Sequence, residues 1–111
     1  MSKTLIAASA RPMILSLLLK RESFGYRILQ NVMTLSGGTI GRSEALLYFV
    51  LHRMKKEGVI PSRRKMSEEN RMRKYYALTD FGRRELEVEK ERRLSSHGAF
   101  LRLWTPAEQT E

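Results

Sequence analysis

The chain contains no cysteine, and this absence excludes two kinds of small protein. Without thiols the fold cannot depend on disulfide bonds, as many small secreted domains do, and no thiolate zinc site can form. No apolar run reaches the roughly 20 residues of a membrane-spanning helix, and the first residues lack the basic, apolar and small segments of a secretory signal. We therefore expect an intracellular protein of the cytoplasm with no membrane partner.

Residues suited to catalysis are also scarce. The two histidines, His52 and His97, have no partners at the spacing of a metal site, and neither a glycine-rich phosphate loop nor a nucleophile motif occurs. The sequence therefore predicts no enzyme, no cofactor and no metal centre.

Basic side chains are present in excess, and their distribution is uneven. The formal net charge is +9; residues 1–78 hold fifteen Lys and Arg against five Asp and Glu, whereas residues 79–111 hold six against seven. Such a block favours a polyanionic partner, and nucleic acid is favoured over a membrane because no continuous basic amphipathic helix is present. The 111 residues suffice for one domain with a modest core, so association with a second copy is a reasonable expectation.

The first third of the chain predicts two short helices. An apolar run over residues 13–19 is followed by two cations, which suit a helix C-terminus, and Pro12 is acceptable if it lies in the first turn. Ser23 is the expected N-cap of a second helix that continues to Leu35. Residues 36–38, Ser-Gly-Gly, supply a left-handed stop after it.

A third helix is predicted from Glu44 to the glycine at position 58. Ser43 is its expected N-cap, and the charge of Glu44 suits the positive end of the helix. Apolar residues recur at spacings of three and four, as on a buried helix face. They are Leu47, Val50, Leu51 and Met54.

Two strands joined by a charged tip should follow. The first strand is predicted to begin at Val59, with Pro61 near its end or on an edge, and the tip to span residues 66–72. The second strand covers residues 73–78, and its alternation places even-numbered and odd-numbered side chains on opposite faces.

The last third predicts a capped helix with an apolar end. Thr79 is its N-cap, a highly charged section follows, and residues 95–98 indicate a break. The apolar end has too little core of its own to cover it, so it should pack across a two-fold axis against the first helix of a second copy. The residues assigned to this dimerisation surface, which would also form any effector pocket, are Leu86, Phe100, Leu101, Leu103 and Trp104.

This order of elements, mainly helical with a small β-hairpin wing, predicts a winged helix-turn-helix followed by a C-terminal dimerisation helix. The third helix is short enough for the major groove, and the stretch from Arg53 to Lys74, with nine cations against three anions, can reach phosphates or the minor groove. The residues predicted to contact double-stranded DNA are Tyr26, Arg42, Ser43, Glu44, Tyr48, Arg63, Arg64, Lys65, Arg71, Arg73 and Lys74. We expect residues 1–78 to form the DNA-binding domain, 79–105 the dimerisation helix and 106–111 a polar tail.

Five strings in order carry a family resemblance. They are F-G-Y-R-I-L at 24–29, S-G-G at 36–38, E-A-L-L-Y at 44–48, H-R-M-K-K-E-G-V-I at 52–60 and R-K-Y-Y-A-L-T-D-F-G at 73–82. In this order and spacing the chain resembles the PadR-like family of transcriptional regulators. The resemblance implies a homodimeric repressor that binds a palindromic operator, is associated with the nucleoid through DNA, and is released by a small, often aromatic, effector.

The resemblance also implies roles for single residues. Tyr26, Ser43, Glu44 and Tyr48 match helix positions that lie at the DNA, and Lys74 matches the wing cation. Two features depart from the family pattern. Leu46 and Phe49 stand where members often have threonine and proline, and residues 89–93 lack the tryptophan that some drug-responsive members place midway along the last helix.

Two other readings belong to different classes of binding protein. A winged helix can serve as an adaptor that binds another regulator, here through Leu46 and Phe49, but an adaptor does not need a strongly basic wing. RNA binding is disfavoured because clustered exposed aromatics for base stacking are not evident in the sequence.

Overall fold

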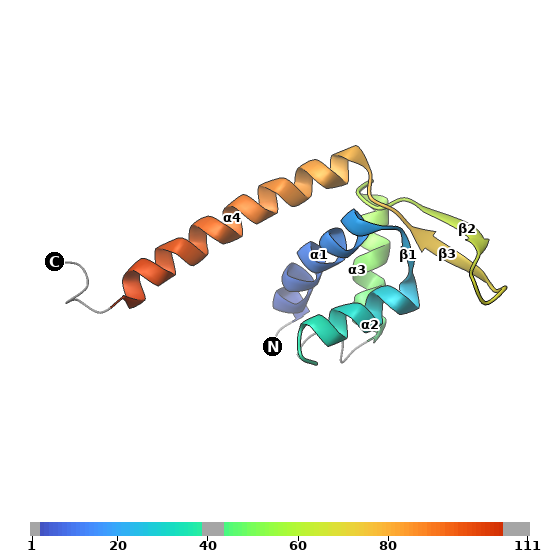
Figure 1. The fold of residues 1–111 in the computed structure, drawn as a ribbon, viewed down its shortest axis with the longest axis horizontal. Coiled ribbons are helices and arrows are strands. Elements are labelled where there is room, and N and C mark those ends of the chain that lie inside the picture. The colour runs from blue at the N-terminus through green and yellow to red at the C-terminus, as the bar shows by residue number, and fades with distance from the viewer. Residues whose placement is uncertain (1–2, 39–43, 106–111) are drawn as a thin grey trace.

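The structure, a computed structural model, describes residues 3–38 and 44–105 of the chain. Within these ranges the elements follow in the order α1 (Lys3–Lys20), β1 (Ser23–Phe24), α2 (Gly25–Leu35), α3 (Glu44–Lys56), β2 (Ser62–Met66), β3 (Met72–Tyr76) and α4 (Asp80–Trp104). Figure 1 shows α1, α2 and α3 gathered together, the β2–β3 hairpin projecting on one side and α4 running away on the other. The predicted fold class, mainly helical with a small wing and a long C-terminal helix, is confirmed.

The core lies where α1, α2 and α3 meet. All four residues predicted to face the core from α3 are at most 5% exposed. They pack with apolar side chains of the other two helices, chiefly Ile14, Leu15, Leu18, Ile28, Leu29 and Val32. Burial of each such side chain stabilises the fold by about 1.5–3 kcal/mol, so this cluster is the main source of stability. No helix in the described part of the chain is long and apolar enough to cross a membrane.

Helix α1 differs from its prediction at Pro12. The helix begins at Lys3, so Pro12 lies in its interior rather than in its first turn. An interior proline costs about 3 kcal/mol, because it removes one backbone hydrogen bond and crowds the preceding turn. Burial of Ala10 and Ile14 on either side of it offsets that cost, and the Ser16 hydroxyl donates to the Pro12 carbonyl at 2.7 Å.

Helix α2 confirms the predicted stop and corrects the predicted cap. Gly37 and Gly38 have φ angles of 64° and 83°, the left-handed conformation that the Ser-Gly-Gly string indicated. The N-cap, however, is Phe24, which makes no side-chain capping bond. Ser23 lies in β1 and pairs with Tyr76, because the short antiparallel pairing with β3 takes up this segment.

The wing is shorter at its base than predicted, and β3 is its central strand in the order β1-β3-β2. Val59 and Ile60 do not begin the strand; both are fully buried in the helical core, and β2 starts after Pro61. The Pro61 carbonyl still accepts a bond from the Ala77 amide at 3.1 Å, which holds the base of the hairpin together. The tip lies where it was predicted but is shorter, because Met66 and Met72 pair as the last residues of the ladder. The second strand is Met72–Tyr76 and not residues 73–78.

Hydrogen bonds and close packing fix the junction between the wing and α4. Thr79 is the N-cap as predicted, and its hydroxyl accepts from the Gly82 amide at 2.9 Å and donates to the Gly58 carbonyl at 2.9 Å. A Cβ at position 82 would lie 2.5 Å from the Val59 carbonyl oxygen, so only glycine allows this approach. The start of α4 is therefore fixed against the wing and the core.

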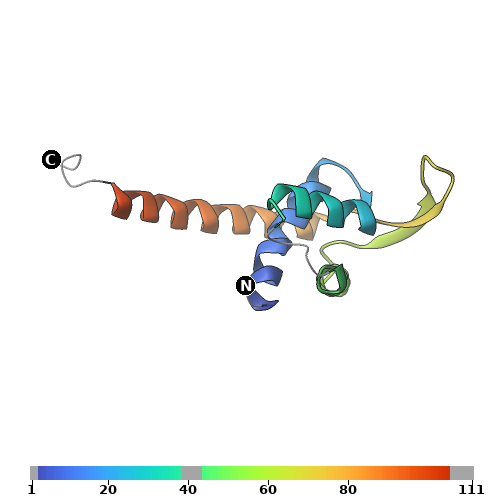
Figure 2. The same cartoon turned by 90° about the horizontal axis from the view of Figure 1, so that it is seen from below.

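The predicted break within the last helix is wrong. Helix α4 continues without interruption for 25 residues, through residues 95–98. One glycine within a helix costs only about 1 kcal/mol, and ion pairs such as Arg93 Nε to Glu89 Oε1 at 2.7 Å support the preceding turns. Figure 2 shows the distal end of α4 extending clear of the other described elements.

Candidate nucleic-acid interface

The two sides of the wing carry different residues. Because directly paired residues of an antiparallel ladder point to the same face, the register of β2 and β3 sorts the side chains into two sets. The α3 side consists of Arg64, Met66, Met72, Lys74 and Tyr76. The Glu22 side consists of Arg63, Lys65, Arg73 and Tyr75.

Cations on the Glu22 side are held by the chain itself. The Glu22 carboxylate forms ion pairs with Lys65 and, at 3.4 Å, with Arg63. The hydrogen bond from Lys65, with further attraction from the Lys65 and Arg63 charges, lowers the pKa of Glu22. The Arg73 guanidinium lies 4.2 Å from the centroid of the buried Phe24 ring. These contacts position the wing against the segment between α1 and α2.

The α3 side presents cations that repel one another. Lys74 lies near Lys55 of α3, and the Lys55 charge is the largest cause of a lowered Lys74 pKa, with some desolvation and the Arg64 charge adding to it. Among the residues that the structure describes, Arg64, Lys74 and Lys55 form no ion pair with a carboxylate. This side therefore concentrates positive charge that the fold itself does not neutralise.

A shallow groove of about 270 Å³ separates this side of the wing from the starts of α2 and α3. Its lining residues include Tyr26, Tyr48, Met72 and Lys74. A Cβ at Gly25 would lie 3.0 Å from the Tyr48 ring, so the glycine lets this ring approach closely. Tyr26 and Tyr48 remain 51% and 43% exposed, so both phenols are accessible from solvent.

The Tyr26 hydroxyl accepts a hydrogen bond from Gln30 Nε2 at 2.9 Å, which orients the phenol along α2. Burial, and secondarily the neighbouring Tyr48, raises the pKa of Tyr76 at the base of the groove. The groove therefore combines phenol hydroxyl groups with the cations of the wing.

The structure places the predicted DNA contacts unevenly. It brings Tyr26, Tyr48 and Lys74 together around the groove, with Arg64 on the same side of the wing, and Glu44 is exposed at the start of α3. Arg63 and Lys65 lie on the other side of the wing, whereas Arg73 lines the groove while its guanidinium covers the Phe24 ring. Arg71 is exposed at the tip. Arg42 and Ser43 lie outside the described residues.

Sequence reasoning missed two contributors to this surface. Lys55 faces outward from α3 by its spacing, and strand alternation already separated the even-numbered from the odd-numbered cations. The ion pairs of Glu22 could not be predicted from nearby residues, because its partners Arg63 and Lys65 come 41 and 43 positions later in the chain. No group of three or more His, Cys, Asp or Glu side chains that could hold a metal ion is found in the described ranges.

The predicted dimerisation residues separate into two groups. Leu86 is only 1% exposed in the core of the single chain, so it cannot belong to an exposed association surface as predicted. By contrast, Leu103 and Trp104 are 76% and 70% exposed, and the Trp104 ring stacks on Phe100 with centroids 5.3 Å apart. Leu101 is half exposed beside them.

Comparison with known proteins identifies a family. A model described as "Transcriptional regulator PadR-like family" matches residues 14–88. An uncharacterized protein of Lysinibacillus sphaericus is 34% identical over 70 residues, which are 63% of this chain and 64% of that protein. The chain thus spans less than two thirds of the length of this curated relative.

Solved structures show the same fold. A PadR-like transcriptional regulator from Bacillus cereus superposes with a TM-score of 0.79 at 26% identity, covering 93% of this chain and 99% of that chain. A transcriptional regulator from Clostridium thermocellum gives 0.76 at 26% identity, with 95% and 99% covered. Bacillus subtilis PadR in complex with operator DNA gives 0.60 at 31% identity, with 70% of this chain and 44% of that chain covered.

Proposed function

The chain belongs to the PadR-like family of transcriptional regulators, and from this premise we propose that it is a homodimeric repressor that binds a palindromic operator in double-stranded DNA. The observation that carries the proposal is the cluster of Arg64, Lys74 and Lys55 on the α3 side of the wing. These like charges lie close together without a carboxylate partner in the described part of the chain. A row of phosphates would relieve this repulsion, and released counterions would add to the binding free energy.

The groove between α3 and the wing is the proposed position of one DNA backbone strand. The start of α3, with Ser43 and Glu44, would enter the major groove, where Glu44 can accept from a cytosine amine. Tyr26 and Tyr48 would donate their hydroxyls to phosphates, beside Lys74. In this arrangement α3 reads the sequence, whereas the cations and phenols fix its position.

A dimer is supported by the distal end of α4. Phe100, Leu101, Leu103 and Trp104 are 49–76% exposed, more apolar surface than one helix end of a monomer ordinarily leaves in water. Pairing of two copies there would present two α3 helices to half-sites about one helical turn apart. Such a regulator would act in the cytoplasm, bound to the nucleoid.

The stacked pair Phe100 and Trp104 is also the proposed contact for a small planar aromatic effector. Quenching of Trp104 fluorescence by such compounds, with release of DNA, would support this role. Unchanged emission and unchanged DNA affinity would remove the effector from the proposal.

A salt titration tests DNA binding directly. Two duplexes should be compared: one of random sequence and one that the protein has selected from a random pool. For both, the logarithm of the binding constant should fall linearly with the logarithm of the salt concentration, with a slope of roughly −0.9 per phosphate neutralised. Replacing Arg64 and Lys74 with Ala should weaken both complexes and reduce the slope by about one per lost contact. The matched control is Arg63→Ala, one residue away on the Glu22 side, which should change the slope less.

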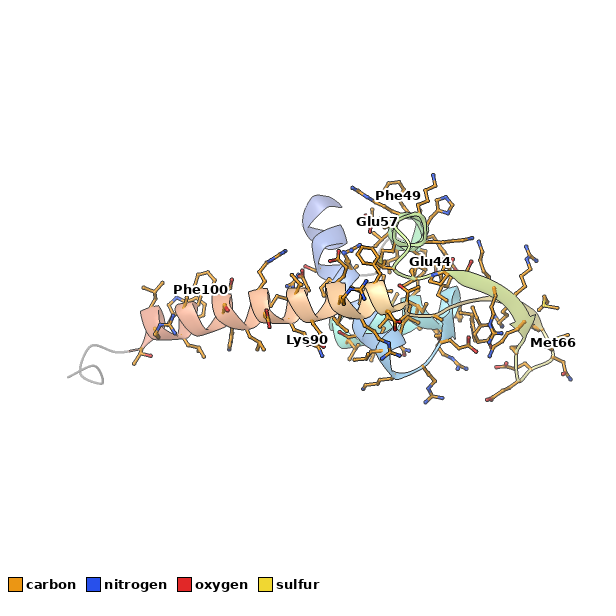
Figure 3. All side chains as sticks on the ribbon, turned by 90° about the horizontal axis from the view of Figure 1, so that it is seen from above. Glu44, Phe49, Glu57, Met66, Lys90 and Phe100 are labelled. Carbon is orange, nitrogen blue, oxygen red and sulfur yellow. The ribbon has the colours of Figure 1, made fainter. Side chains whose placement is uncertain are left out.

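The second candidate function is a protein-interaction adaptor, and the exposure of Phe49 favours it. Phe49 is 59% exposed, and Figure 3 shows it at the outer edge of α3. A slope near zero for every duplex would reject DNA binding and leave the adaptor as the better account. Loss of affinity for selected DNA in Phe49→Ser, with binding of random DNA retained, would instead place Phe49 at the bases.

A further inference from the structure

Two exposed methionines face each other at the tip of the wing. Met66 and Met72 form the last residue pair of the β2–β3 ladder, and their side chains are 54% and 58% exposed. Neither belongs to the hydrophobic core. Figure 3 shows Met66 at the end of the molecule opposite to α4. In the described part of the chain, the wing therefore ends in an apolar pair that lies outside the hydrophobic core.

The tip that carries this pair is well defined. The Ser67 amide donates to the Arg71 carbonyl at 2.8 Å, and the Arg71 amide donates to the Ser67 hydroxyl at 3.3 Å. Asn70 adopts a φ of 59°, the left-handed conformation that closes the turn. Hydrogen bonds from its own amide and from Ser67 lower the pKa of Glu69, which fits a settled turn. The two methionines are thus presented together by a closed hairpin.

By strand alternation the methionines share a side with the cations of the proposed interface, and Met66 also lines a hollow on the Glu22 side with Lys65 and Tyr75. Met66 and Met72 lie two residues beyond Arg64 and Lys74, which form the preceding pair on the α3 side. Two residues of a strand span about 6.6 Å, close to the depth of about 7.5 Å of the minor groove. An apolar pair at this distance beyond phosphate-binding cations would be long enough to reach into an adjacent minor groove.

We propose, resting on the DNA-binding function above, that Met66 and Met72 enter the minor groove beside each half-site as an apolar wedge that partly unstacks one base step. Methionine is among the residues that act as such wedges, and its thioether chain adapts to irregular surfaces. Unstacking costs least at pyrimidine–purine steps such as TA. The wedge would therefore select flanking sequence that α3 does not contact.

The test uses a duplex selected by the wild-type protein from a random pool, made with either a TA or an AA step at the flank. A 2-aminopurine base at that step reports unstacking by increased fluorescence. The wild type should increase the emission and prefer the TA flank. The double variant Met66→Gln, Met72→Gln keeps a similar side-chain length but is polar. It should show no fluorescence increase, and its preference for the TA flank over the AA flank should be about tenfold smaller, as expected when one base step is no longer distinguished.

Matched variants separate the wedge from other effects. The double variant Met66→Leu, Met72→Leu should retain the emission increase, because the contact needs apolar shape rather than sulfur. Met33→Gln, at a 41% exposed methionine on α2, should behave as wild type. The salt slope of the Gln variant should equal that of the wild type, since no phosphate contact is lost.

The outcomes distinguish the two proposals. If the wild type binds duplexes but the Gln variant keeps its emission increase and flank preference, the wedge is overturned and the DNA-binding function stands. A reduced salt slope in the Gln variant would also overturn the wedge, because it would mark a phosphate contact. Failure of the wild type to bind any duplex would reject the function on which the wedge rests.

Discussion

The two ends of α4 share one continuous helix but differ in how they are stabilised. At the proximal end Leu86 is buried, and Glu85 accepts from Arg11 of α1 at 3.5 Å. At the distal end Leu94, Leu103 and Trp104 are at least 70% exposed. Among the described residues of α4, the large apolar side chain that the core covers is Leu86, in the part of the helix nearest the other helices. The proximal end completes the fold, whereas the distal end offers apolar surface to another molecule.

The wing shows the same contrast in its charges. On the Glu22 side the chain supplies its own partners, and on the α3 side the cations lie beside one another. In both elements, the groups for which the described part of the chain supplies no partner are the ones proposed to bind another molecule. If this division is real, substitutions on the two sides of each contrast should have unequal effects.

The first prediction compares Leu86→Ala with Leu103→Ala. Removing the buried Leu86 side chain should lower the free energy of unfolding by about 2–5 kcal/mol, since it leaves a cavity between α4 and the core. Leu103→Ala should change stability by less than about 0.5 kcal/mol in dilute protein, as is usual for exposed positions. Denaturant unfolding at several protein concentrations measures both.

The concentration series serves as the control for association. Leu86→Ala should be destabilised at every concentration, whereas Leu103→Ala should lose stability only where the wild type associates. Equal losses for the two variants in dilute protein would contradict the division of α4.

The second prediction compares two glycines of the same helix. Gly82→Ala places a Cβ against the Val59 carbonyl and the Leu78 side chain, so we expect a loss of about 1–3 kcal/mol from crowding. Gly98→Ala meets only the Arg102 guanidinium at 3.6 Å, so it should stabilise the helix by about 0.5–1 kcal/mol. Thermal unfolding of both variants checks the opposite signs. A stabilised Gly82→Ala variant would show that the wing junction is loosely packed.

Much of the fold could be predicted from local patterns. The buried face of α3 followed from apolar spacing, the N-cap Thr79 from its side chain, and the stop after α2 from the Gly37-Gly38 pair. Each of these depends on residues within one or two turns, so the sequence carries the signal directly.

The remaining features depend on distant contacts. Ser23 has the side chain of an N-cap, but pairing with Tyr76 draws it into a strand. Pro12 is tolerated within α1 because the burial of Ala10 and Ile14 on either side of it offsets the lost helix hydrogen bond. Strand alternation predicted that the wing has two faces. It did not predict which face carries the cations proposed to bind DNA, because that depends on Glu22, which comes 41 residues before Arg63.

The third prediction concerns the two ends of α4 as capped termini. Thr79→Ala should lower stability by about 1 kcal/mol, because the Gly82 amide loses its acceptor and the Gly58 carbonyl its donor. At the other end, the Thr105 hydroxyl donates to the Leu101 carbonyl at 2.7 Å, but that turn is exposed. Thr105→Ala should therefore have a smaller effect. Thr79→Ser is the conservative control, because it keeps the hydroxyl and removes only the methyl group. If Thr79→Ser lost as much stability as Thr79→Ala, the methyl group and not the hydroxyl would be the source of the stabilisation.

The fourth and smallest effect concerns pH and the Glu22 side of the wing. Because ion pairs with Lys65 and Arg63 lower the pKa of Glu22 below its ordinary value of 4.5, the charged carboxylate stabilises the folded state. This contribution is fully present above the pKa of the unfolded chain and is lost as the pH falls through the lower pKa of the folded chain.

The stability difference between wild type and Glu22→Gln should therefore be constant from pH 7 to about pH 5 and shrink below that. Its size should be within about 1 kcal/mol, since the pair is partly exposed. Unfolding in denaturant at pH 7 and pH 3 measures it, and Lys65→Gln should remove most of the same pH dependence. A difference that persists unchanged at pH 3 would mean that Glu22 positions the wing through packing and not through its charge. The contrast between the two sides of the wing would then rest on shape alone.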